Sequence, residues 1–400
     1  MGSAYRIIPS GGITSAKGFL AGAVHAGIRS EDELDLAILY SEAPCAAAGV
    51  FTTNQIKSAP VIISQRHLAS GRAQAIVANS GCANACVGEQ GLADALEMAG
   101  LAAAKLGIPL EDVLAASTGV IGAPLPMDRV RSGIREIGLS REGGRDFARA
   151  IMTTDTAIKE IAIQVNTGEF IIAGAAKGAG MIHPDLATML CFMTTDALVD
   201  ARFLQSSLLR AVEISLNMIS VDGDTSPSDC VFLLANGLAK NELISFNNGE
   251  AFRQALNDVC IYLARFIARG GEGATKLMEV TVEGAKQQAE ARLAARTIAS
   301  SALVKAAMHG NDPNWGRIVA ALGRSGAELV EERLDVYLSN ICVMKQGCPV
   351  PFNKEDVRTV LATGETVLIR VCLNLGSGKA TAWGCDLSEE YVTINSQYTT

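Results

Sequence analysis

The chain has 400 residues, of which 49% are hydrophobic and only 5% aromatic. It is long enough to bury one large layered core or two lobes, built mainly from Ala, Val, Ile and Leu. The formal net charge is -8, and no block of lysine and arginine offsets it, which argues against nucleic acid or an anionic membrane surface as partner. We therefore expect a globular protein that acts on small molecules.

The amino-terminal stretch "MGSAYRIIPSGGITSAKGFLAGAVHAG" lacks a basic region followed by an unbroken apolar run. No window approaches the roughly 20 apolar residues of a membrane span, so we expect a cytoplasmic protein. Ten cysteines are scattered through apolar surroundings and only four histidines are present. Buried, reduced thiols are the simplest interpretation, and no metal site is predicted.

Helical and extended patterns alternate along the chain. Apolar residues that recur every three or four positions indicate helices, and short β-branched runs bounded by Gly, Asn or Pro indicate strands. In chain order we expect strands at 60–64 and 73–81, a helix at 92–107, strands at 161–165 and 169–178, a helix at 201–219, a strand at 229–237, helices at 250–271 and 284–308, and strands at 333–344 and 366–376. This mixture predicts a layered α/β fold.

The stretch "PLEDVLAASTGVIG" (109–122) changes from apolar to small and hydroxyl-bearing residues. A tight turn there could direct backbone N–H groups at a ligand. The common catalytic signatures are absent, since no Gly-x-Ser-x-Gly pattern occurs. The stretch "LGSGKAT" (375–381) lacks the first glycine and the final Ser or Thr of a phosphate-binding loop.

The most unusual stretch is "KGAGMIHPDLATMLCFMTTDA", residues 177–197, in which glycines and Pro184 precede an apolar run. A threonine hydroxyl becomes a good nucleophile when a base is near, and an amino-terminal threonine carries that base as its own α-amine. Thr188 would gain this amine if its hydroxyl attacked the Ala187 carbonyl and water then split the chain. The residues alone also allow a simpler interpretation, in which Thr188 only opens a buried strand.

A series of blocks in this sequence resembles the ArgJ family, the glutamate N-acetyltransferases that are also called ornithine acetyltransferases. The blocks are "NSGCANAC" (79–86), "STGVIG" (117–122), "IMTTDT" (151–156), "KGAGMIHPDLATML" (177–190), "SVDGDTSPSD" (220–229), "GGEGATK" (270–276), "HGNDPNWGR" (309–317) and "NSQYTT" (395–400). They follow the family order over nearly the whole chain.

This resemblance implies a layered αββα sandwich, similar to N-terminal-nucleophile hydrolases but with different connectivity. It implies self-cleavage between Ala187 and Thr188 into an α chain (1–187) and a β chain (188–400) that fold together as one catalytic unit. Two α and two β chains would form a heterotetramer, as family members usually do.

The resemblance also implies the chemistry. Thr188 would take an acetyl group from N2-acetylornithine and pass it to glutamate in a ping-pong reaction of arginine biosynthesis. The hydroxyl of Thr118 and the backbone N–H of Gly119 would stabilise the oxyanion in each half-reaction. No bound cofactor is implied. Some family members also accept acetyl-CoA as a co-substrate, and no residue of this chain separates the two kinds.

Residue by residue, the family pattern assigns a set of substrate contacts to this chain. They are Thr154, Lys177, Thr188, Glu272, Asn395 and Thr400. Lys177 could pair with an α-carboxylate, Glu272 could bind an amine, and Thr400 would bring the terminal carboxylate to the site. The competing interpretation is that Lys177 and Glu272 are ordinary solvated charges.

Two other functions remain open at this stage. An amidohydrolase or aminopeptidase of related fold would use the same threonine with water in place of glutamate, and a structural or binding protein would use Thr188 only as a strand residue. Asp222, Asp224 and Asp312 could suggest a metal site, but aspartates in such motifs more often support turns and strand ends.

Overall fold

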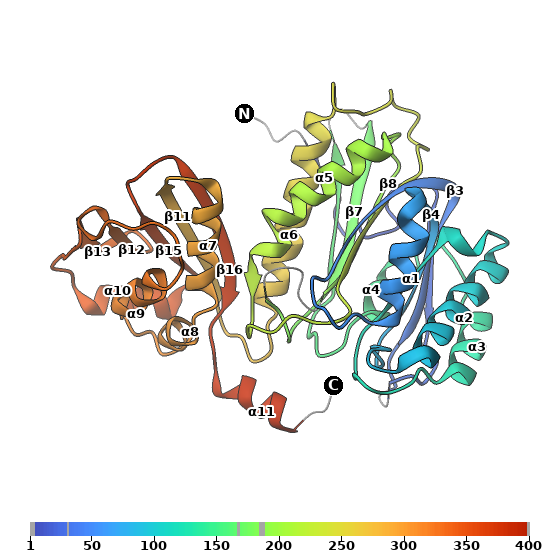
Figure 1. Cartoon of the computed structure of the whole chain (residues 1–400), viewed down its shortest axis with the longest axis horizontal. Coiled ribbons are helices and arrows are strands. Elements are labelled where there is room, and N and C mark those ends of the chain that lie inside the picture. Colours follow the sequence, from blue (N-terminus) through green and yellow to red (C-terminus); the bar gives the residue numbers. More distant parts are fainter. Residues whose placement is uncertain (1–4, 30–31, 166–168, 184–188, 398–400) are drawn as a thin grey trace.

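The computed structural model describes residues 5–29, 32–165, 169–183 and 189–397. In this part of the chain two β-sheets are combined with helices, which confirms the predicted α/β class (Figure 1). The first sheet has the order β1 (Tyr5–Ile7), β6 (Lys159–Val165), β7 (Phe170–Lys177), β8 (Leu190–Thr195), β10 (Cys230–Ala235), β3 (Leu36–Phe51), β4 (Arg72–Asn79), β5 (Val113–Ser117), with β2 (Phe19–Val24) paired to β3.

The second sheet lies beside the first and is built mostly from the last third of the sequence (Figure 1). Its order is β14 (Cys348–Pro349), β13 (Ile341–Lys345), β12 (Asp335–Leu338), β15 (Thr366–Cys372), β11 (Leu277–Ala285), β16 (Gly378–Cys385), β9 (Ile219–Ser220). Because β9 immediately precedes the loop that leads to β10, the chain passes from one sheet to the other between residues 220 and 230.

Strand β8 lies near the middle of the first sheet, between β7 and β10. All six of its residues are buried, and its sequence LCFMTT is a nearly continuous apolar run, as expected for a strand covered on both faces. β7 and β8 are antiparallel with Lys177 opposite Leu190, so residues 178–189 form the connection of a β-hairpin. The apolar run that follows residue 188 in the sequence is therefore a buried strand.

Helices cover both sheets. Those packed with the first sheet are α1 (Ala59–His67), α2 (Gly88–Leu106), α3 (Met127–Glu136), α4 (Gly144–Ala150) and α5 (Ala201–Glu213). Those associated with the second are α7 (Gln288–Ala299), α8 (Ala302–His309), α9 (Trp315–Gly323) and α10 (Lys354–Thr363), whereas α11 (Glu389–Gln397) lies apart from this sheet (Figure 1).

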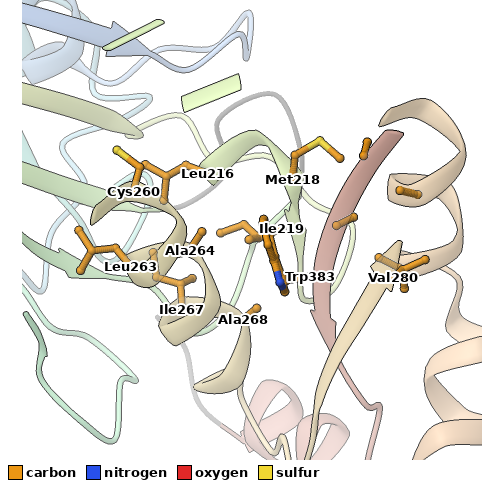
Figure 2. Packing of buried hydrophobic residues seen from close by; sticks show 14 of the residues in the cluster. Leu216, Met218, Ile219, Cys260, Leu263, Ala264, Ile267, Ala268, Val280 and Trp383 are labelled. Carbon is orange, nitrogen blue, oxygen red and sulfur yellow. The ribbon is translucent and has the colours of Figure 1, made fainter. Parts of the chain in front are cut away.

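Helix α6 (Glu250–Arg269) contacts both sheets, since it packs on β6 and β7 and also on β16 and β9. Its buried face repeats at helical spacing and includes Leu263 and Ile267. Figure 2 shows this face turned toward Trp383 of β16 and Ile219 of β9, which joins the two sheets through one continuous apolar cluster.

Several predicted elements differ from the structure. Residues 60–64 were expected to form a strand but lie in α1, where Pro60 occupies the first turn, a position that needs no backbone N–H donor. The expected helix at 201–219 ends at Glu213, and the one at 284–308 is divided into α7 and α8 by Ser300 and Ser301. The strand at 333–344 is a hairpin of β12 and β13.

Within the described residues no helix is both long and apolar enough to cross a membrane. All ten cysteines are free thiols, and most of them are buried, which agrees with the interpretation from sequence. In the same residues, no group of three or more His, Cys, Asp or Glu side chains is arranged to hold a metal ion.

Candidate active site

A pocket lies where the turn after β5, the end of β7 and the loop before β10 meet the start of β11 and the last helix. It encloses about 560 Å³ of empty space, part of which opens to solvent. Its lining residues are Ala83, Thr118, Gly119, Ile121, Thr153, Thr154, Lys177, Gly180, Met181, Ser226, Ser228, Glu272 and Asn395. Ala187, Thr188 and Thr400 lie outside the described residues.

The pocket therefore brings together all of the predicted site residues that the structure describes. They are Thr118, Gly119, Thr154, Lys177, Glu272 and Asn395. The first and the last of these residues, Thr118 and Asn395, are 277 positions apart in sequence. Their convergence on one concave site is the arrangement expected of a ligand-binding pocket with a few polar groups.

Gly119 occupies a turn that only glycine can form. Its φ angle is 128°, and a Cβ atom placed there would lie 2.4 Å from the Gly81 carbonyl carbon. The turn is fixed by hydrogen bonds from the Thr118 nitrogen to the Asn79 oxygen at 3.1 Å and from the Val120 nitrogen to the Gly81 oxygen at 3.3 Å. The Gly119 N–H donates no hydrogen bond to another described residue, and Gly119 lines the pocket.

The hydroxyl of Thr118 is oriented by Lys177. The Lys177 ammonium donates to Thr118 Oγ1 at 3.3 Å, and both side chains are buried. An ammonium group can only donate, so Thr118 must be the acceptor in this contact. The hydroxyl hydrogen of Thr118 is thereby left to point at another acceptor, such as an oxyanion in the pocket.

Lys177 belongs to a buried group of charges. Asp155 Oδ1 accepts hydrogen bonds from Lys159 Nζ and from the Gly178 nitrogen. Burial alone would raise the pKa of Asp155, but the Lys159 and Lys177 ammonium groups lower it below its ordinary value. Burial lowers the pKa of Lys177, and Asp155 opposes that change. The negative charge of Asp155 thus favours a positively charged Lys177 at the pocket.

Glu272 lies in the loop before β11 and is only 9% exposed. Its nitrogen donates to the Ala179 oxygen at 2.9 Å, and its Oε2 accepts from Asn395 Nδ2 at 2.8 Å. A Cβ atom at Gly180 would lie 2.5 Å from the same carboxylate oxygen, so this glycine allows the close approach. The interpretation of Lys177 and Glu272 as solvated surface charges is wrong, because both are buried at the pocket.

Sequence reasoning missed three buried polar residues around the pocket. Asp155 lies in the block "IMTTDT", and Ser228 and Asp229 lie in "SVDGDTSPSD". Burial raises the pKa of Asp229 well above its ordinary value, although Lys177 acts in the opposite direction. The family blocks that contain these residues were the only sequence signal for them. Their roles could not be predicted, because the side chains of Asp155 and Asp229 contact residues that are distant in sequence.

Comparison with known proteins decides the family. The model of the ArgJ family matches residues 20–400. This chain belongs to the ArgJ family. The resemblance predicted from the motifs is confirmed, and with it the expectation that the protein is an enzyme of the acyltransferase class.

Individual relatives match the chain from end to end. The arginine biosynthesis bifunctional protein ArgJ of Dehalococcoides mccartyi (strain CBDB1) is 55% identical over 406 aligned positions, covering 100% of both chains. The protein of that name from Symbiobacterium thermophilum is 52% identical, covering 98% of this chain and 99% of the relative. A crystal structure of ArgJ from Bacillus halodurans is 44% identical, with a TM-score of 0.50, and covers 51% of this chain and 97% of its own.

Proposed function

We propose that this ArgJ-family acyltransferase is a glutamate N-acetyltransferase of arginine biosynthesis, which moves an acetyl group from N2-acetylornithine to glutamate. The observation that carries the proposal is the pocket itself. It combines the two oxyanion donors at Thr118 and Gly119 with a buried cation at Lys177 and a buried carboxylate at Glu272. Thr188 belongs to the connection between β7 and β8, and Lys177, the last residue of β7 before that connection, lines the pocket.

The enzyme first cuts its own chain. The Thr188 hydroxyl attacks the Ala187 carbonyl carbon, the peptide C–N bond breaks, and the proton of the hydroxyl is transferred to the departing nitrogen. Water then hydrolyses the resulting ester, which restores the hydroxyl and leaves a carboxylate on Ala187 and a free α-amine on Thr188. In support, the matching Bacillus halodurans chain spans only about half of this one.

The acetyl group is then moved in two steps. The Thr188 hydroxyl attacks the acetyl carbonyl carbon of N2-acetylornithine, while its α-amine takes the hydroxyl proton and delivers it to the departing ornithine amine. The amine of glutamate next attacks the acetyl-threonine ester and restores the hydroxyl. Each step passes through a tetrahedral oxyanion, which the Thr118 hydroxyl and the Gly119 N–H stabilise, and both residues line the pocket.

The remaining pocket residues bind the amino-acid parts of the substrates. Glu272 is suited to the side-chain ammonium of ornithine. Asn395 donates a hydrogen bond to the Glu272 carboxylate and holds it in position. Lys177 supplies positive charge for a substrate carboxylate, and Thr154 supplies a hydroxyl to the same pocket. Thr400, at the end of the same segment as Asn395, completes this set.

The proposal extends to the assembly and the setting of the enzyme. Two α and two β chains form the heterotetramer, without nucleic acid or membrane as partner, and the reaction takes place in the cytoplasm. Acetyl-CoA is a second acetyl donor to be tested with glutamate alone.

The test is turnover of N2-acetylornithine by the purified protein with and without glutamate. The proposal predicts N-acetylglutamate and ornithine in equal amounts, dependent on glutamate, and neither cleavage nor turnover in the Thr188→Ala variant. Release of acetate without any dependence on glutamate would instead support the amidohydrolase. Full turnover in Thr188→Ala would remove Thr188 as the nucleophile.

A further inference from the structure

We propose that the motif "SVDGDTSPSD" (220–229) holds both flanks of the bond between residues 187 and 188, and that Asp222 and Asp229 are positioning residues for self-cleavage. This inference rests on the proposed function, which requires the cleavage. Sequence patterns alone assigned the motif only to turns and strand ends.

The downstream flank is fixed by Asp229. Because β8 and β10 are parallel with Leu190 opposite Cys230, Asp229 lies directly beside Met189. The Met189 nitrogen donates to Asp229 Oδ1 at 2.7 Å, and the Cys230 nitrogen donates to the Met189 oxygen at 3.3 Å. Asp229 and Met189 are at most 1% exposed. The residue bonded to Thr188 is thus held by a carboxylate as well as by the sheet.

The upstream flank is fixed by Asp222. Its Oδ2 accepts from the Met181 nitrogen at 2.6 Å, and its Oδ1 accepts from the Ile182 nitrogen at 2.8 Å. The Val221 nitrogen also donates to the Ile182 oxygen at 2.7 Å. Met181 has a φ angle of 55°, a left-handed conformation that is unfavourable for a non-glycine residue and persists only where the surroundings enforce it. The Asp222 carboxylate is one such constraint.

The loop that carries both aspartates is itself rigidly supported. It runs from the second sheet to the first, and residues 52–58 hold its backbone along the way. Thr52 Oγ1 donates to the Ser226 oxygen at 2.7 Å, Asn54 Nδ2 to the Thr225 oxygen at 2.8 Å, and the Ser58 nitrogen to the Pro227 oxygen at 2.9 Å. One supported loop therefore sets the positions of both anchored ends.

Asp222 holds the backbone at Met181 and Ile182, and Asp229 holds it at Met189, the first described residue after residue 188. Attack of a hydroxyl on the preceding carbonyl is an intramolecular reaction, so its rate depends on how often the reacting atoms are in contact. Fixing the flanks in advance removes part of the conformational entropy that this contact would otherwise cost. The two aspartates act through the backbone and need not touch the reacting atoms.

The experiment follows conversion of freshly synthesised full-length chain into two fragments by denaturing electrophoresis over time. Asp222→Ala and Asp229→Ala should each slow this conversion by roughly tenfold or more. Asp222→Asn should give an intermediate rate, because an amide retains one of the two acceptor oxygens. Asp224→Asn is the matched control, since it removes a charge from an exposed position of the same loop and should cleave at the wild-type rate.

Thermal unfolding and circular dichroism of the purified chains separate slow cleavage from misfolding. The inference is overturned if both alanine variants are folded and cleave at the wild-type rate. If the alanine variants fail to fold, a folded Asp222→Asn chain that cleaves at the wild-type rate overturns it equally. A wild-type chain that stays intact while it turns over substrate would contradict the proposed cleavage itself, and not the positioning by these aspartates.

Discussion

At the scale of single residues, the two proposed oxyanion donors are a backbone N–H held by a tight turn and a side-chain hydroxyl held by a buried lysine. The Gly119 N–H is fixed by a turn that approaches Gly81 too closely for any other residue. The Thr118 hydroxyl is oriented by a lysine that can only donate to it. Donors that are fixed before the reaction need no reorganisation as negative charge develops, which is why they stabilise a transition state strongly.

Replacement of Thr118 tests this arrangement. Thr118→Ala removes one oxyanion donor and should lower kcat on the order of a hundredfold, with a smaller effect on KM. Thr118→Ser keeps the hydroxyl and should retain most of the activity. Steady-state kinetics with N2-acetylornithine and glutamate measures both, and an unchanged kcat in Thr118→Ala would remove Thr118 from the oxyanion site.

Replacement of Asp155 tests the buried charges beneath the pocket. Asp155→Asn leaves Lys159 and Lys177 without their buried counter-ion and should lower the free energy of unfolding by about 3–5 kcal/mol. Asp146→Asn, on the exposed face of α4 near Arg149, should cost less than about 1 kcal/mol. Urea unfolding near neutral pH makes the comparison.

The difference in unfolding free energy between wild type and Asp155→Asn should depend on pH. The pKa of Asp155 is lower in the folded chain than its ordinary value of 3.8, so the charge stabilises the fold fully above that value. This stabilisation is lost as the pH falls through the lower folded pKa. The difference between wild type and Asp155→Asn should therefore shrink in acid, and a difference that stays constant would contradict the assignment.

At the scale of elements, helix α11 serves the pocket more than the core. None of its described residues is buried, yet it places Asn395 against Glu272. Deletion of residues 389–400 should leave the free energy of unfolding within about 1 kcal/mol of wild type. It should raise KM by roughly tenfold or more, because it removes both Asn395 and the proposed contact Thr400, and one hydrogen bond to a charged group alone is worth about tenfold. Val392→Ala, exposed on the same helix, is the control and should change neither quantity.

Elements whose apolar residues recur at a regular spacing were predictable from sequence, and elements that depend on tertiary packing were not. The helix at 250–269 has an apolar face at regular spacing and was found within two residues at its end. The strand predicted at 60–64 was wrong, because these residues lie in helix α1, which packs against β5. The long strand β3 was missed, since its small and polar residues resemble no simple alternation.

The pocket shows the same division. The family blocks predicted which residues form the site, and six of those residues line one pocket. No pattern revealed that Asp155 would support Lys177 or that Asp222 and Asp229 would hold opposite flanks of one bond. These contacts depend on strand order, which short-range sequence patterns do not encode.

At the scale of the whole molecule, the first sheet interleaves the two proposed chains. β8 and β10 follow residue 188 in sequence, and they lie between β7 and β3, which precede it. Both edges of this pair are hydrogen-bonded to strands of the first chain. The cleaved protein should therefore elute as one species in native chromatography and separate into two chains only in denaturant. Two chains that part without denaturant would contradict the interleaved sheet.

The pocket also draws on both proposed chains, since Thr118 and Lys177 precede residue 188 and Glu272 and Asn395 follow it. The most direct test of the whole account is mass spectrometry of the protein after brief exposure to N2-acetylornithine without glutamate. We predict a fragment that begins at Thr188 and carries one acetyl group, which disappears when glutamate is added. An intact chain, or a fragment that never carries acetyl during active turnover, would contradict the account.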